Sequence, residues 1–174
     1  MAKIIEIYKV RKMRNNKKIT IFSVAQTFLN FESMSPKKLQ KLCYYAYAWH
    51  ITLCDKRKLF DNHFEAWIHG PVNPELYDKY REYGWSEIPK VEKLPNEIAE
   101  NRGIYEFIEM VYGSYGHLDA NQLEYLTHQE MPWINARQGL AAHKPSNNVI
   151  NVEDVFNQYS QDLKNDQEKT KTEI

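Results

Sequence analysis

Apolar residues recur at intervals of three and four along most of the chain, which is the spacing of one buried face of an α-helix. The longest such stretch runs from Pro36 to Leu53, where tyrosines lie beside the apolar stripe. Ser35 can accept hydrogen bonds from the first free amides of this helix, and proline suits its first position. We therefore predict a central helix that is apolar or aromatic on almost all sides.

The same spacing, together with end signals, predicts further helices. Asn73 and Asp119 are expected to cap two of them, and Gly84 is expected to end the first of these two. One predicted helix begins near Ile21 and another ends at His128. Helices are also predicted over 74–83, 97–112 and 153–163, with a short turn of helix after Pro132.

A short stretch alternates in the manner of a strand. Residues 64, 66 and 68 would share one face, while Trp67 and His69 would lie on the other, and Gly70 and Pro71 are expected to end the strand. A second brief strand is expected over 147–152. These elements predict a mainly α fold of the α+β kind, a single compact helical domain with a small β-hairpin or short sheet.

Composition limits the classes of partner. The 23 basic and 23 acidic residues leave no net charge, so nothing global favours nucleic acid or an anionic membrane. No apolar run approaches the roughly 20 residues that a membrane span needs, and no signal peptide is recognisable. We expect a cytoplasmic protein.

Charge is uneven at the two ends of the chain. Residues 1–19 form a basic leader with the single acid Glu6, and this leader is either an arm that contacts nucleic acid weakly or a solvated segment. Residues 164–174 have almost nothing to bury and are expected to be a disordered polar tail. The folded domain is therefore predicted over 20–163.

No pattern of catalysis or metal binding is present. The histidines are scattered without the paired spacing of zinc sites, and we expect no metal and no cofactor. His128 and Glu130 could act as an acid and base pair in a cleft, although capping of backbone groups is the favoured interpretation. Cys43 and Cys54 would lie about 16 Å apart along one helix, too far for a disulfide.

The aromatic stretch FEAWIHGPVNPELYDKY, residues 64–80, is the candidate partner-binding site. An edge strand offers free backbone groups, and aromatic rings supply contact area with few rotamers to freeze. Trp67 and His69 are either core residues or exposed aromatics. The predicted partner-binding residues are Trp67, His69, Tyr77, Tyr80, Tyr44 and Tyr45.

Three stretches resemble the Panacea domain of SocA-like and GepA-like antitoxins, which occurs in bacterial and prophage toxin–antitoxin pairs. They are SPKKLQKLCYYA at 35–46, FEAWIHGPV at 64–72 and LTHQEMPW at 126–133, within a similarity that covers about 20–160. The resemblance implies an antitoxin that binds a small toxin directly and is not an enzyme. One related type acts as an adaptor that hands its toxin to the Clp protease. Residues 1–19 precede the usual start of the domain.

The leading hypothesis is therefore a protein that neutralises a cognate toxin. The alternative is a DNA-contacting regulator of its own operon that uses the basic leader.

Overall fold

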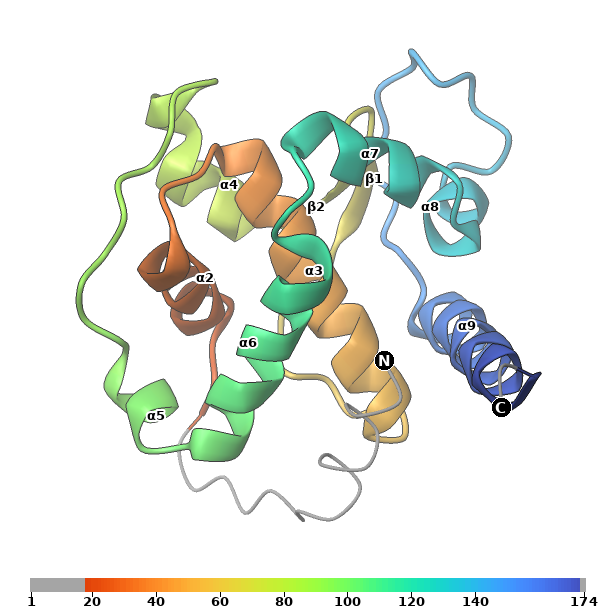
Figure 1. Ribbon diagram of the computed structural model, residues 1–174. Helices are drawn as coiled ribbons and strands as arrows, with labels where there is room; N and C mark the ends of the chain where they lie inside the picture. Colours follow the sequence, from red (N-terminus) through yellow and green to blue (C-terminus); the bar gives the residue numbers. More distant parts are fainter. Residues whose placement is uncertain (1–17, 173–174) are drawn as a thin grey trace.

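The computed structural model describes residues 18–172, and the long helix α3 (Pro36–Leu53) passes through its middle (Figure 1). Every residue from Leu39 to Ile51 is buried, which confirms the predicted central helix. The predicted cap is also present, because the backbone amide of Lys38 donates to Ser35 Oγ at 3.3 Å and Pro36 occupies the first turn. The helix thus begins where its local sequence favours a start.

Ser35→Ala should lower the free energy of unfolding by about 1 kcal/mol, because the cap satisfies an amide at the start of the helix. Urea denaturation of the purified protein measures the loss. Ser33→Ala is the matched control, since its hydroxyl bonds only to the exposed carboxylate of Glu87. Equal losses in the two variants would show that the hydroxyl of Ser35 does not act as a cap.

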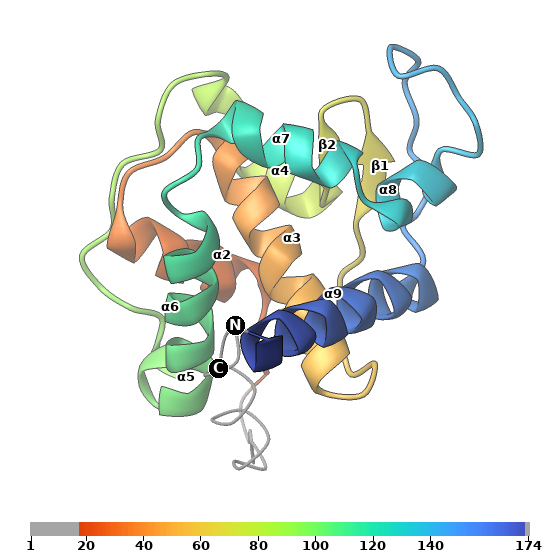
Figure 2. The ribbon, with the colours of Figure 1, turned by 45° about the vertical axis from the view of Figure 1, so that its right-hand side comes forward.

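The other helices surround α3. Figures 1 and 2 show α9 crossing its C-terminal half on one side, with α2 and α6 on the other side. The remaining helices are short and connect these larger elements. The helices around α3 are α2 (Ile21–Phe31), α4 (Pro74–Tyr80), the 3-10 turn η1 (Arg81–Tyr83), α5 (Asn96–Ala99), α6 (Arg102–Tyr115), α7 (Ala120–His128), α8 (Met131–Ala136) and α9 (Val152–Thr172).

The β element is a two-stranded antiparallel hairpin of β1 (Glu65–Trp67) and β2 (Gly70–Val72). The sequence predicted one strand that ended at Gly70 and Pro71, and that boundary is wrong. The chain turns at residues 68 and 69 instead, and Gly70 starts the returning strand with a φ of +95°, which glycine adopts without the clash of a Cβ. The predicted strand over 147–152 is reduced to an isolated bridge, Glu65 to Val149.

Two helix boundaries also differ from the predictions. The helix expected over 97–112 is two helices, α5 and α6, because the side chain of Asn101 accepts from the amide of Ile104 at 3.2 Å and starts a new helix. The last helix was expected to end at Leu163 before a disordered tail, but α9 continues to Thr172. Hydrogen bonds between polar side chains one turn apart stabilise this extension. For example, the side chain of Gln161 donates to that of Asn165 at 3.0 Å.

The basic stretch 1–17 lies outside the described residues, and so does the nucleic-acid contact predicted for it. Residues 173 and 174 are outside them as well. Within the described range 18–172, no helix is long and apolar enough to cross a membrane.

Candidate partner-binding site

Two of the predicted partner-binding residues belong to the core. Tyr44 and Tyr45 are buried, so their prediction as partner-binding residues is wrong. The ring of Tyr44 lies edge-on to Phe64 at 5.3 Å, and the ring of Tyr45 stacks on Tyr115 at 3.9 Å. Both side chains are covered by neighbouring elements at this point of α3, so neither is accessible to a partner.

The other four predicted residues come together in one cleft of about 400 Å³. Trp67 is half-buried, His69 is exposed, and Tyr77 is 43% exposed. Tyr80 lines the same cleft but is only 8% exposed, so it lies mainly in the core. Tyr77 and Tyr80 do not present one shared outer face, because α4 turns Tyr80 toward α3.

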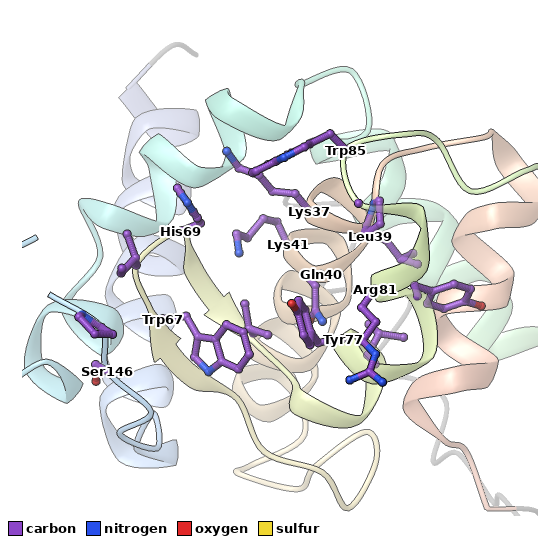
Figure 3. Close-up of a pocket in the computed structure, with 17 residues that line it drawn as sticks. Lys37, Leu39, Gln40, Lys41, Trp67, His69, Tyr77, Arg81, Trp85 and Ser146 are labelled. Carbon is purple, nitrogen blue, oxygen red and sulfur yellow. The ribbon is translucent and has the colours of Figure 1, made fainter. Parts of the chain in front are cut away.

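The cleft lies between the hairpin and the segment that contains α4 and η1, with the first half of α3 as its floor (Figure 3). Trp67 of the hairpin lies beside Tyr77 of α4, with ring centroids 5.0 Å apart. His69 in the turn of the hairpin meets Trp85 edge-on at 6.2 Å. Aromatic side chains from segments on opposite sides of the cleft thus form its rim.

Trp85 was not among the predicted site residues, although it is 77% exposed and lines the cleft. In the sequence it stands in a connection that contains proline, where nothing marks it as part of a site. An unburied Trp in a loop is the signal that could have identified it, because Trp is usually well buried.

The outer edges of the hairpin do not offer the free backbone groups on which the predicted interface was based. On the β1 side, the amide of Ala66 donates to the carbonyl of Asn148 at 2.9 Å. On the β2 side, Pro71 has no amide hydrogen, and its carbonyl accepts from Lys41 Nζ at 2.9 Å. Addition of a partner strand is therefore not favoured, and side chains must provide the contact surface.

Lys41 is a buried basic side chain beneath the hairpin, only 1% exposed. Burial lowers the pKa of its ammonium group to about 7, although the nearby carboxylate of Glu124 opposes this change. Glu124 itself forms an ion pair with Lys37 and lies 3.1 Å from Nδ1 of His69. These interactions outweigh burial and lower the pKa of Glu124, so this carboxylate is ionised and already engaged.

His128 and Glu130 do not form an acid and base pair. The imidazole of His128 stacks on the indole of Trp133 at 4.0 Å. The carboxylate of Glu130 accepts from the hydroxyl of Tyr45 at 3.0 Å and from that of Tyr159 at 2.7 Å. The favoured capping interpretation is also wrong for Glu130, because its side chain binds these two tyrosines and makes no cap bond. It joins α9 to α3.

Glu130→Gln should make the protein less sensitive to rising pH. Burial raises the pKa of Glu130 from 4.5 to about 7 in the folded state, so the folded protein holds this proton more tightly than the unfolded chain. That contribution is complete below pH 4.5 and is lost as pH rises toward 7. Between pH 5 and pH 8, the Glu130→Gln variant should therefore gain roughly 2 kcal/mol relative to the wild type.

Urea denaturation at each pH measures this difference. The matched control is Glu153→Gln, whose carboxylate is exposed beside Lys56. Parallel pH profiles for Glu130→Gln and the wild type would contradict the assignment of the buried proton to Glu130.

Contacts join the three stretches that carry the family resemblance. Lys41 of the first stretch binds the carbonyl of Pro71 in the second. The indole of Trp133 in the third stretch donates to the carbonyl of Trp67 in the second at 2.9 Å. Tyr45 and Glu130 connect the first stretch with the third. The three stretches thus specify one structural unit, and the cleft lies on its surface.

A model of the family described as "Antitoxin SocA-like, Panacea domain" matches residues 39–134, which is more than half of the chain and includes all the contacts just described. The chain belongs to this family. Comparison with curated proteins and with solved structures returned no match. The Panacea domain therefore contains most of α3, the hairpin and helices α4 to α7, while the helix α9 that packs on it lies beyond the matched range.

The family description gives the chain an antitoxin-like domain, which suggests a role other than catalysis. Among the described residues, no group of three or more His, Cys, Asp or Glu side chains is placed to hold a metal ion. The buried thiol of Cys43 has a pKa raised by desolvation, which disfavours the reactive thiolate.

Proposed function

We propose that this protein is the antitoxin of a toxin–antitoxin pair and that it neutralises a small protein toxin by binding it directly. Its membership of the SocA-like family supports the antitoxin role. The observation that best supports direct binding is the aromatic rim of the cleft, where Trp67, Tyr77 and Trp85 are accessible to a partner. Tyr and Trp are the residues that most often dominate the binding energy of protein interfaces.

The shape of the cleft also supports a protein partner. Its rim is exposed while its floor, formed by α3, belongs to the rigid core. A partner that covers Trp85 and Tyr77 would remove apolar surface from water without requiring the domain to rearrange. Such preorganised aromatic surface is typical of interaction sites on soluble proteins.

Expression of the reading frame adjacent to the gene, alone and together with this chain, tests the proposal. We expect growth arrest when the neighbour is expressed alone, growth when both are expressed, and co-purification of the two proteins. Absence of toxicity, or protection without any complex, would contradict neutralisation by direct binding.

The same assay distinguishes an adaptor from an inhibitor that acts by binding alone. In cells without Clp protease, an inhibitor should still protect, and the toxin should accumulate in the complex. An adaptor should lose protection in these cells, because the toxin would no longer be degraded. We expect protection to persist, because the cleft alone provides a surface that a toxin segment can occupy.

A further inference from the structure

The cleft has a charge bias that the whole chain lacks. The chain has no net charge, yet the residues that line the cleft include Lys37, Lys41 and Arg81 and, within the described part of the chain, no Asp or Glu. His69 adds an imidazole at the rim. The interior of the cleft is therefore both aromatic and cationic.

Nearby carboxylates do not remove this bias. Glu124 lies outside the lining and pairs with Lys37, so it offsets the charge of that lysine, but among the described residues it forms no ion pair with Lys41 or Arg81. Arg81 has two loose acidic neighbours, Asp78 at 3.5 Å and Glu82 at 3.7 Å, but these carboxylates are exposed and are screened by water. Neither of them lines the cleft.

Lys41 is the group with the strongest need for a counter-charge. Its ammonium donates to the neutral carbonyl of Pro71, and no carboxylate of the described residues lies within 4.0 Å of it. A buried charge that lacks an ionic partner is costly, and an opposite charge brought into the same low-dielectric surroundings offsets that cost. A ligand carboxylate in the cleft would supply this opposite charge.

From these observations we infer that the cleft binds a segment of the toxin in which an apolar or aromatic side chain stands next to an Asp or Glu. The apolar side chain packs on the rings of Trp67 and Tyr77, which lie side by side, and the carboxylate points toward Lys41 on the floor. The cleft volume of about 400 Å³ suits a few side chains of such a segment. This inference rests on the proposed function and adds the chemistry by which the toxin is recognised.

The exposed rim favours a protein segment over a small metabolite. Trp85 and Tyr77 stand at the mouth of the cleft, where a small molecule on the floor would leave them in water. A polypeptide that enters the cleft also passes over the rim and covers both rings. The partner therefore contacts the cleft along its full depth.

Photo-crosslinking locates the bound segment. Benzoylphenylalanine replaces Trp85 in one variant and Tyr125 in a control variant, since Tyr125 is 66% exposed on α7 and does not line the cleft. Each variant is co-purified with the product of the adjacent reading frame, irradiated and analysed by mass spectrometry. We expect a crosslink from position 85 to a segment that contains an acid beside apolar residues, and none from position 125.

A double-mutant cycle then tests the charge recognition. Lys41→Met keeps an unbranched side chain that is one atom shorter and removes its charge, and the acid of the crosslinked segment is replaced by its amide. Each single change should weaken binding about tenfold or more. The pair of variants that carries both changes should bind no more weakly than a pair that carries only one of them. Lys56→Met is the control on the chain, because Lys56 lies away from the cleft in an exposed ion pair.

The amide variant of the toxin keeps the test valid even if Lys41→Met does not fold, because it requires no change in this chain. Additive effects, a crosslinked segment without an acid, or a crosslink only from position 125 would overturn the inference. A small molecule retained in the purified chain, without a crosslink from position 85, would overturn it in favour of a ligand pocket. Failure of the two proteins to co-purify would instead contradict the proposed function itself.

Discussion

Gly70→Ala should lower the free energy of unfolding by about 2 to 4 kcal/mol, the largest loss that we expect from adding a single methyl group to this protein. A Cβ at this position would lie 2.7 Å from Thr127 Oγ1 and 2.9 Å from Lys41 Cε. The φ of +95° adds backbone strain for any residue with a Cβ. Gly70 is therefore the point where the hairpin packs closely on both α3 and α7.

Gly139→Ala is the matched control for this prediction. Gly139 also has a positive φ, +78°, but a Cβ there would meet nothing within 4 Å. Gly139→Ala should lower the free energy of unfolding by about 1 kcal/mol, because it adds backbone strain without a steric contact. Urea denaturation of both variants isolates the contact with Thr127 and Lys41, and equal losses would mean that the hairpin can move away from the helices without cost.

Tyr80→Ala and Tyr77→Ala should have opposite consequences although the two residues are three apart on α4. Tyr80 belongs to the hydrophobic core, so its truncation should cost about 3 kcal/mol of stability. Tyr77 is exposed at the rim, so its truncation should leave stability within about 1 kcal/mol but weaken toxin binding by about 1 to 3 kcal/mol.

Melting temperature and toxin affinity measured on the same two purified variants test this division. Tyr83→Ala is a control on the adjoining turn, because Tyr83 is partly exposed and does not line the cleft. A strong loss of stability in Tyr77→Ala, with no separate loss of affinity, would place Tyr77 in the core as well.

Local sequence signals predicted the start of α3 and the cap of α7 because those signals act within a few residues. Ser35 and Pro36 set the first turn of α3, and Asp119 with Gln122 sets that of α7, whatever packs around them. The break between α5 and α6 was missed because an apolar pattern continues through it, while a single cap at Asn101 decides the boundary.

The hairpin was only partly predictable. Gly70 and Pro71 are ordinary signals for the end of a strand, yet both lie inside β2. Pro71 is tolerated there because its nitrogen, which has no hydrogen to donate, is not needed for a bond to β1. Its carbonyl accepts from Lys41 and not from another strand. That contact spans thirty residues of sequence, and a local pattern carries no information about it.

The sequence predicted which aromatic residues lie near one another at the surface, but it did not predict the basic side chains beside them. Trp67, His69 and Tyr77 lie at one surface cleft, since their stretch forms a strand, a turn and a helix in succession, and their role in partner binding stays a prediction. Tyr44 and Tyr45 were misassigned although their own helix was expected to be central, because the spacing alone does not show which neighbours cover each tyrosine. Lys41 and Trp85 were missed because only the folded chain brings their distant segments to the same cleft.

The affinity of the purified chain for the product of the adjacent reading frame tests the central claim most directly. The decisive comparison is the double variant Tyr77→Ala/Trp85→Ala against Tyr125→Ala, which removes an exposed ring outside the cleft. We predict that the double variant binds about 100-fold more weakly with an unchanged melting temperature, and that Tyr125→Ala binds like the wild type. Wild-type affinity in the double variant would contradict neutralisation through the cleft.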